Sequence, residues 1–351
     1  MLYSINNLNN MKSNYKAWNI DYKDFHSKKT LVDELKFLVN FAVLAPSSHN
    51  SQPWKFEIKD NEIILRPDFE RSLPFSDKNH RQLYISLGAA LENLLIAANY
   101  YNFKTNVKYI NTGSDNFSII ISFEKSEAKE QNNEHLVFSI PRRRTNRNKY
   151  SDCALDQSLI NKIAGFADVD TKIDFILEKD KKDKISDVVS NALITAMDQK
   201  DFRKELSEYI KSNITNSPVG MPASGFGIPT SISLFASSML KRINMNNITK
   251  KQDEALLKNF TPAFILISTK NDNVEDWIKS GRIYESVTLE AEKNNIKTAP
   301  MAAAIQIGEF YKDLQRILDL SFRPQVFCRV GFCEKSASMS PRLTGDKVTK
   351  I

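Results

Sequence analysis

The feature of the sequence that most constrains its fold is a long helical segment that occurs twice. Residues 81–101 carry small and apolar side chains on nearly every side, so they predict a central, buried helix. A second long helix is predicted over residues 275–295. A shift of 193 positions aligns the two helices and pairs Gly281 with Gly88, Glu285 with Glu92 and Ala291 with Ala98. Because each helix also has a similar place in its half, the pattern favours an internal duplication.

Shorter elements are predicted around each long helix. In the first half, a helix is predicted at 31–45 and ends at Pro46, and two strands, 54–58 and 62–66, flank a turn. After the long helix come strands at 107–110 and 117–123, a polar linker at 125–134 and a strand at 135–140. The second half has a strand at 172–177, helices through residue 211 and a strand at 262–268. This order predicts an α+β fold, with an N-terminal extension at 1–30, a first half at 31–140 and a second half at 141–351.

One segment of the second half, residues 213–247, has no counterpart in the first. It contains three glycines and three prolines, followed by an apolar helix predicted at 232–243. Long Gly/Pro loops inside compact domains are usually lids or binding loops. We therefore expect this segment to be a lid.

Composition and cysteine spacing restrict the compartment. The 351 residues are 41% hydrophobic, which allows a large core without disulfides. Cys153, Cys328 and Cys333 are odd in number, with no CxxC pair and no zinc-ligand spacing, so we expect reduced thiols and no metal site. Residues 1–30 lack an apolar export region, and no stretch approaches the ~18 apolar residues of a membrane span. A cytoplasmic protein without a membrane partner is the expectation.

The net charge of +7 admits an anionic partner, which could be nucleic acid, a membrane surface or a phosphate-bearing small molecule. Much of the excess lies in mixed runs such as residues 179–184, which are typical of a solvated face. The compact basic cluster is Arg142-Arg143-Arg144 with Arg147 and Lys149. It has no interleaved aromatic residues, so nucleic acid is the second choice and a small molecule the first.

The most specific stretch is the loop after the first helix, Pro46-Ser47-Ser48-His49-Asn50-Ser51-Gln52-Pro53-Trp54. From the residues alone it reads as a capped helix end and turn, although its polar side chains could also line the edge of a flat heterocycle. The stretch resembles the signature of the nitroreductase family. That resemblance implies that Pro46, Ser47, Ser48, Asn50 and Gln52 line the ring of flavin mononucleotide (FMN), as this loop does in the family from the partner subunit.

The second stretch is Arg143-Arg144-Thr145-Asn146-Arg147. Guanidinium groups make bidentate, charge-assisted contacts with phosphate. The stretch is similar to the Arg-x-Ser-x-Lys/Arg motif that opens a nitroreductase subunit. The resemblance implies that Arg143 and Thr145 hold the phosphate side of FMN, and Arg144 is included among the cofactor-binding residues. Arg147 would approach the ring, where it would stabilise the charge of the reduced flavin.

Two stretches near the end complete the resemblance. The segment around Pro300, Ala302 and Ala303 is similar to the one that gives a backbone N–H to flavin N5 in the family, and Arg342 is similar to a phosphate-binding basic residue. This sequence has Ser340 where the family has a Lys, which leaves Arg143 and Arg342 a larger share of the phosphate. Of the four histidines, only His49 lies in a motif, and a hydrogen-bonded role is expected for it rather than catalysis.

The distribution of these motifs resembles the Acg-like branch of the nitroreductase family. The ring-lining loop occurs in the first half, whereas the phosphate motif, the N5 segment and the terminal Arg occur in the second. A fused pair of halves should then build one FMN pocket in a monomer, with further dimerisation left open. The expected function is two-electron transfer from NAD(P)H through FMN to a nitroaromatic, quinone or similar acceptor. The alternative is a flavin-binding or flavin-storage protein with little turnover.

Overall fold

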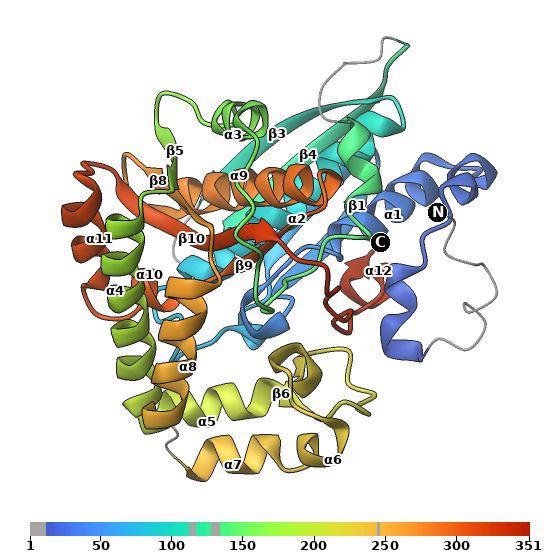
Figure 1. Ribbon diagram of the computed structural model, residues 1–351. Coiled ribbons are helices and arrows are strands. Elements are labelled where there is room, and N and C mark those ends of the chain that lie inside the picture. The colour runs from blue at the N-terminus through green and yellow to red at the C-terminus, as the bar shows by residue number, and fades with distance from the viewer. Residues whose placement is uncertain (1–11, 112–116, 128–133, 244–245) are drawn as a thin grey trace.

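The computed structural model describes residues 12–111, 117–127, 134–243 and 246–351, and these form two main sheets and a short two-stranded one, with helices between and around them (Figure 1). The first sheet has the order β11-β1-β2-β4-β3 and comprises β1 (Trp54–Lys59), β2 (Glu62–Pro67), β3 (Phe103–Asn111), β4 (Phe117–Lys125) and β11 (Thr349–Lys350). The second has the order β5-β8-β10-β9 and comprises β5 (Thr171–Ile176), β8 (Ala263–Thr269), β9 (Ile296–Pro300) and β10 (Arg323–Phe332).

The two sheets repeat one topology. In each, the first two strands are antiparallel neighbours, a long helix follows, and the next two strands add antiparallel in reversed order, so that β1-β2-β4-β3 corresponds to β5-β8-β10-β9. The long helices are α2 (Arg81–Tyr100) and α9 (Val274–Lys293). Each half also begins with a helix, α1 (Leu31–Ala42) or α3 (Gln157–Ala164). This repeat supports the predicted duplication, and the predicted α+β class is confirmed.

The halves differ between their first two strands. A two-residue turn, 60–61, connects β1 to β2, whereas the chain from β5 to β8 contains most of the remaining helices. These are α4 (Lys179–Asp198), α5 (Lys200–Tyr209), α6 (Thr230–Ser233), α7 (Ala236–Arg242) and α8 (Asn246–Asn259), with the short strands β6 (Ile210–Lys211) and β7 (Met221–Pro222). The predicted lid lies within this insertion, and its residues 244–245 lie outside the described ranges.

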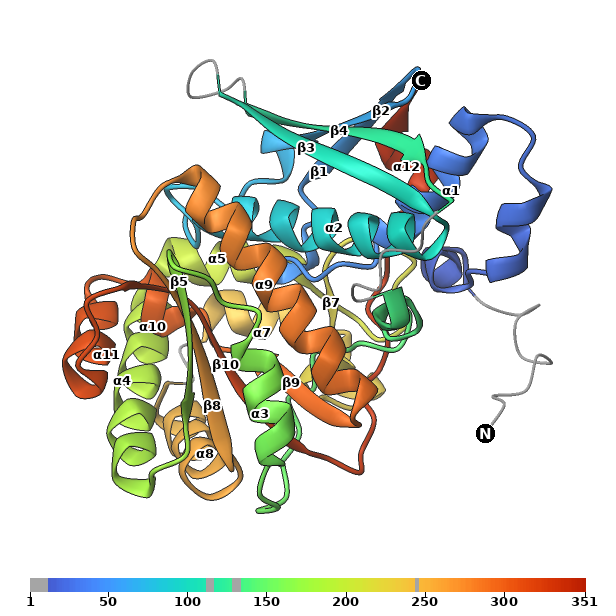
Figure 2. The ribbon, with the colours of Figure 1, turned by 90° about the horizontal axis from the view of Figure 1, so that it is seen from above.

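Side-chain caps explain where several helices begin. Thr30 accepts a hydrogen bond from the backbone N–H of Asp33 at the start of α1, and Asn273 accepts from Glu275 and Asp276 at the start of α9. The long helices α2 and α9 pack against each other between the two sheets (Figure 2). Their interface joins the halves, since Ile278 and Leu289 of α9 belong to the same apolar core as α1 and α2.

The end of the chain returns to the first half. Strand β11 pairs in parallel with β1, with Phe56 opposite Thr349, and completes the first sheet. The backbone N–H of Arg342 donates to the carbonyl of Asn14, so the tail also contacts the N-terminal extension. The first sheet therefore draws a strand from the second half, and the two predicted halves are interlocked.

Two sequence-based predictions are wrong. Residues 135–140, predicted as a strand, contain the 3-10 helix η6 (Glu134–Phe138), in which Leu136 and Val137 are buried in the first core. A short apolar run has no period that separates a strand from a buried helical turn. The single helix predicted at 232–243 is two helices, α6 and α7, separated at Leu234 and Phe235. Residues 128–133 of the predicted linker lie outside the described ranges.

Candidate functional site

The loop after α1 has an unusual backbone. His49, Asn50 and Gln52 have φ angles of 53°, 56° and 55°, in the left-handed region that side chains other than Gly rarely adopt. Such residues persist when the surrounding structure holds them in place. The hydroxyl of Ser47 contributes by accepting a 2.9 Å hydrogen bond from the backbone N–H of Gln52. The surrounding structure therefore holds the backbone of this loop in one conformation, which fixes the positions of its polar side chains.

The amide side chains of this loop bind the lid and the tail. Asn50 Nδ2 donates to the carbonyl oxygens of Gly220 and Pro341, each at 2.9 Å. Gln52 Nε2 donates to the carbonyl of Pro218 at 2.7 Å, and its Oε1 accepts from the backbone N–H of Leu343 at 2.8 Å. Asn50 and Gln52, predicted to line the flavin ring, thus hold three distant segments together.

These segments enclose a small cavity of about 60 Å³. Its walls come from the N-terminal extension, the loop, the arginine stretch, the lid and the tail: Trp18, Pro46, Ser47, Asn50, Arg143, Arg144, Thr145, Arg147, Met221, Pro222, Ser224, Gly225, Phe226, Ser338, Met339, Ser340 and Arg342. Eight of the predicted site residues are in this list. No Asp or Glu is among these lining residues, so the walls are strongly basic.

Arg342 and Arg143 are the most deeply buried cations of the cavity, with 4% and 3% of their surface exposed. Arg342 donates to the side-chain oxygen of Asn50 and to the carbonyl of Ala45, yet its Nε has no hydrogen-bond partner among the described groups. The Nε of Arg143 also lacks one, although it lies 3.4 Å from the carboxylate of Glu285. Burial, followed by the charges of Arg143 and Arg144, holds the pKa of Arg342 well below its ordinary value.

Arg144 and Arg147 complete the basic lining. The Arg144 guanidinium lies 3.7 Å from the centre of the Trp18 ring, and burial lowers its pKa to about 9. The Arg147 guanidinium lies 4.6 Å from the centre of the Phe226 ring, and burial lowers its pKa as well. Four cations therefore share one small space, an arrangement that a bound anion would stabilise.

The other predicted site residues do not line this cavity: Ser48, Gln52, Pro300, Ala302 and Ala303. Ser48 donates instead to the side-chain oxygen of Gln82. The segment at 300–303 lies near the arginine stretch, because Thr145 pairs with Thr298 in the middle of β9. The structure thus brings together the predicted phosphate residues and part of the predicted ring-lining loop.

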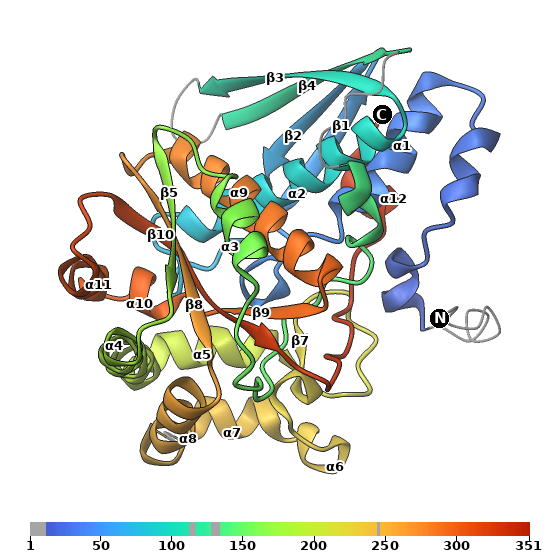
Figure 3. The ribbon, with the colours of Figure 1, turned by 45° about the horizontal axis from the view of Figure 1, so that its top comes forward.

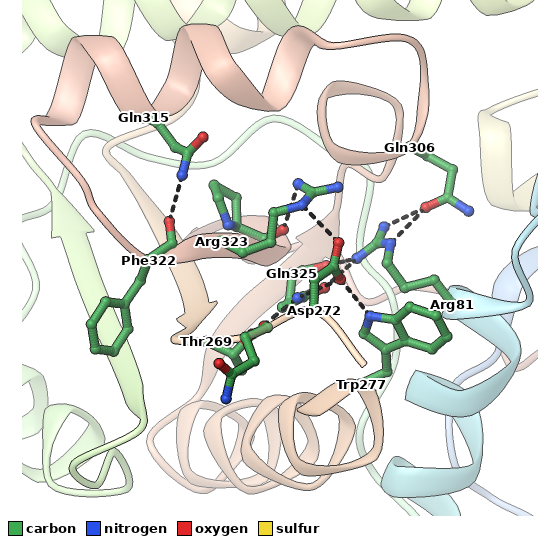
Figure 4. A network of polar contacts seen from close by, with 11 residues as sticks. Arg81, Thr269, Asp272, Trp277, Gln306, Gln315, Phe322, Arg323 and Gln325 are labelled. Atoms are coloured by element: carbon green, nitrogen blue, oxygen red, sulfur yellow. Dashed lines mark hydrogen bonds and ion pairs between the residues drawn. The ribbon is translucent and has the colours of Figure 1, made fainter. Parts of the chain in front are cut away.

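A polar network that includes the buried Arg81 and Gln325 anchors the segment at 300–306 to the first half (Figure 4). Gln306, at the end of α10 (Ala303–Gln306), accepts a hydrogen bond from Nε of Arg81 at 3.1 Å and donates to Asp77. Arg81 also donates to Oε1 of Gln325 in β10 at 3.1 Å. In the same figure, Asp272 accepts from the ring N–H of Trp277 at 2.6 Å. The network cross-links the N-terminal ends of α2 and α9.

His49 takes part in a further polar chain. Its Nε2 lies 3.1 Å from the hydroxyl of Ser76, which in turn donates to the carboxylate of Glu205 in α5. The backbone N–H groups of Phe75 and Ser76 donate to the same carboxylate, each at 2.9 Å. Burial, followed by the charge of Arg147, lowers the pKa of His49 to about 4. His49 is therefore neutral near pH 7 and joins the loop to the insertion, as its expected hydrogen-bonded role requires.

Nine of the lining residues, Trp18 and Phe226 among them, were not predicted as site residues, and neither was the neighbouring Glu285. Trp18 lies in the N-terminal extension, for which no site residue was predicted, Phe226 lies in the lid, and Glu285 was noted only as a match between helices. An aromatic residue that precedes the first predicted helix was the available signal for Trp18. Within the described ranges, no group of three or more His, Cys, Asp or Glu residues could hold a metal ion.

No family model matches the chain. The chain is 24% identical over 321 residues to a "Putative NAD(P)H nitroreductase" of Mycobacterium tuberculosis, covering 88% of each protein. It is 21% identical over 333 residues to the "Putative NAD(P)H nitroreductase acg" of the same organism, covering 91% of this chain and 96% of the relative.

Among solved structures, the FMN- and NADPH-dependent nitroreductase NfnB from Sphigopyxis sp. strain HMH matches with 16% identity and a TM-score of 0.41, over 61% of this chain and 96% of that one. A nitroreductase-like family protein from Bacillus cereus matches with 13% identity and a TM-score of 0.36, over 62% and 95%.

Proposed function

We propose that this chain, a member of the nitroreductase family, binds one FMN in the arginine-lined cavity and transfers two electrons from NAD(P)H to a nitroaromatic, quinone or similar acceptor. The observation that carries the proposal is the set of four guanidinium groups around one cavity whose lining residues include no carboxylate. Two of these groups, those of Arg143 and Arg342, keep a buried Nε without a hydrogen-bond partner. A phosphate supplies the charge and the acceptor oxygens that such groups require.

The residues present suit the phosphate end of FMN directly. Arg143 and Arg342 would hold the phosphate with Thr145, and Trp18 would keep Arg144 in place by stacking against its guanidinium. Arg147 would lie toward the ring and stabilise negative charge there. When bound, FMN supplies the redox chemistry by accepting a hydride from NAD(P)H and passing two electrons to the acceptor. The protein then needs orientation and electrostatics rather than an acid–base pair.

The small volume of the cavity limits which part of FMN can bind without a movement of the lid. Small-molecule sites usually have about 300–1,000 Å³, whereas this cavity has about 60 Å³. The room suits a phosphate-sized group, and the lid residues from Met221 to Phe226 close the remainder. Binding of the flavin ring therefore requires this part of the lid to move outward.

The same closure favours a second candidate function, flavin binding or storage with little turnover. The lid is tied to the loop by the bonds from Asn50 and Gln52, and Phe226 covers Arg147. A ring held beneath it would be shielded from both NAD(P)H and an acceptor. The two functions share the phosphate site and differ in whether the lid opens during turnover.

The wider setting follows from the same proposal. A fused pair of halves carrying one copy of each motif would act as a monomer with one site. Free Cys153, Cys328 and Cys333 accord with a reducing, cytoplasmic location. The helices in the described part of the chain include none long and apolar enough to cross a membrane.

A titration tests the phosphate site and the stoichiometry together. Flavin-free protein would be titrated with FMN and with riboflavin, and acid-released flavin would be quantified against protein. We expect one FMN per chain and much weaker binding of riboflavin. Arg342→Met should weaken FMN but leave riboflavin almost unchanged. Two flavins per chain, or equal affinities for FMN and riboflavin, would overturn the assignment. Anaerobic mixing with NADPH then separates turnover from storage by the rate of flavin bleaching.

A further inference from the structure

Exposed apolar side chains are concentrated in one segment of the chain, which contains α6 and α7. Thirteen large hydrophobic side chains are exposed among the described residues, and seven of them lie between positions 214 and 243: Ile214, Phe226, Ile232, Leu234, Phe235, Met239 and Ile243. Leu234 and Phe235 are 58% and 64% exposed. We call these seven residues the α6–α7 face. Monomeric proteins rarely expose apolar clusters of this kind unless the surface binds something.

The α6–α7 face points away from a small core that is already complete. Ser233 and Ala236 are buried, and Ala236 joins Ile210 and Ala223 in an apolar cluster against the end of α5. The hydroxyl of Ser237 donates to the carbonyl of Ser207 at 2.7 Å and fixes α7 on α5. Figures 1 and 3 both show α6 and α7 at the outer edge of the molecule, with α5 between them and the body. Leu234 and Phe235, at the junction of the two helices, therefore stay largely exposed, whereas the ring of Phe226 also contacts Arg147 at the cavity.

The charges on this segment have one sign. Residues 210–243 contain no Asp or Glu, and their charged residues are Lys211, Lys241 and Arg242. Lys241 and Arg242 are exposed at the end of α7. A fourth cation, Lys12, donates from Nζ to the carbonyl of Ile214 at 3.2 Å. The apolar face is therefore flanked only by positive charge from its own segment and from the extension.

The charges around the α6–α7 face distinguish two possible partners for it, a second copy of the chain and a lipid surface. A second copy of the chain, joined by a two-fold axis through the α6–α7 face, would offer Lys241 and Arg242 no carboxylate from residues 210–243, because that segment has none. An anionic lipid surface offers the opposite charge to Lys241 and Arg242 and an apolar layer to Leu234 and Phe235. We propose that the α6–α7 face docks onto the surface of an anionic lipid bilayer.

Docking of this kind needs no membrane-spanning helix. It departs from the sequence-based expectation of no membrane partner, which rested on the lack of a span and on the choice of a small molecule as the anionic partner. The proposal is also independent of the flavin. Docking would nevertheless place the cavity close to the lipid surface, because Phe226 belongs both to the cavity wall and to the α6–α7 face. The docked protein would hold the mouth of the cavity against the lipid.

Vesicle co-sedimentation tests the proposal with the full chain. Vesicles of phosphatidylcholine alone would be compared with vesicles that also contain phosphatidylglycerol, at low and high salt. We expect binding to the anionic vesicles and release by salt. Leu234→Ser/Phe235→Ser should reduce the bound fraction by about tenfold or more. Lys241→Gln/Arg242→Gln should weaken binding and flatten its salt dependence.

Matched controls lie elsewhere on the surface. Val169→Ser/Leu177→Ser removes two exposed apolar side chains, and Lys104→Gln/Lys108→Gln removes two exposed cations of β3. Both should bind vesicles like the parent protein, and thermal melting would show that all four variants are folded. Equal binding by parent and Leu234→Ser/Phe235→Ser, or no binding to anionic vesicles, would overturn the proposal. So would a dimer in light scattering that the same two substitutions convert to a monomer.

Discussion

Gly88 of α2 lies so close to α9 that a methyl group at its Cα would be 2.0 Å from the carbonyl oxygen of Ile278. The contact is reciprocal, because a methyl group on Gly281 would be 2.0 Å from the carbonyl oxygen of Ile85. Each residue of one contact is 193 positions from its counterpart in the other, which is the shift that aligned the two helices in the sequence. The glycines are thus required by a near-symmetric helix crossing.

This geometry predicts a matched loss of stability. Gly88→Ala and Gly281→Ala should each lower the free energy of unfolding by about 3 kcal/mol or more, because the obstacle is backbone rather than a movable side chain. Gly165→Ala is the control, since its nearest neighbouring atom would be 3.3 Å away and its φ is −68°. Urea unfolding of the three variants provides the measurement. A mild effect at one of the two crossing glycines would contradict the symmetric packing.

The arginine site predicts unequal losses of FMN. Arg143→Ala should lose roughly ten times more affinity than Ser47→Ala, because a charge-assisted contact to phosphate contributes about 1.5–3 kcal/mol and a neutral hydrogen bond about 0.5–1.5 kcal/mol. Fluorescence titration with FMN measures both. Similar affinities for the two variants would remove Arg143 from the phosphate site.

The same substitution also affects the flavin-free protein, which has to be controlled. Arg143→Ala leaves the buried carboxylate of Glu285 without the guanidinium 3.4 Å away, and breaking such pairs costs about 3–5 kcal/mol. Adding Glu285→Gln to Arg143→Ala should restore much of the stability while leaving FMN binding weak. If affinity returned together with stability, Arg143 would be a structural residue only.

His49 predicts a specific pH dependence of stability. Its pKa is lowered from the ordinary 6.5 to about 4 in the folded protein. Below pH 6.5 the unfolded chain takes up a proton that the folded protein does not, so this group lowers the free energy of unfolding as pH falls toward 4. The loss should amount to about 1–3 kcal/mol. His49→Asn, which tolerates the left-handed backbone, should lose this slope in urea unfolding measured across the same range. An unchanged slope would show that His49 is not the group responsible.

How far the sequence could predict the structure depended on the distance between interacting residues. The long helices, their pairing and most strands follow from local composition and period. Trp18 was missed because its ring N–H donates to the carbonyl of Ser340, 322 positions away. Glu205 was missed because it reaches Ser76 across 129 positions from an insertion with no counterpart in the first half. Local patterns contain no information about such contacts.

The loop amides show a different limit. Asn50 and Gln52 were predicted to line a flavin ring, and the residue types were appropriate because amides donate and accept hydrogen bonds. The backbone carbonyls of Gly220 and Pro218 are hydrogen-bond acceptors, as a flavin ring edge is. In the structure they accept hydrogen bonds from the side-chain amides of Asn50 and Gln52. A motif therefore identifies the available hydrogen-bonding groups, while tertiary packing decides which partner they bind. The flavin contacts of these two residues stay a prediction.

The last prediction concerns the lid, residues 213–247. Met221 to Phe226 close the cavity, and Phe226 stacks on Arg147, so removal of the lid should open the path to the flavin ring. Replacing 213–247 with a short Gly/Ser linker should speed both reduction by NADPH and release of FMN, measured by stopped-flow absorbance and by fluorescence. Phe226→Ala should show the same trend more weakly, and it keeps the bonds from Asn50 and Gln52. If reduction were unchanged while electron transfer to an acceptor failed, the lid would form part of the acceptor site, as a dedicated enzyme requires. Unchanged rates in both steps would show that the lid does not control access, and storage by closure would then have no structural basis.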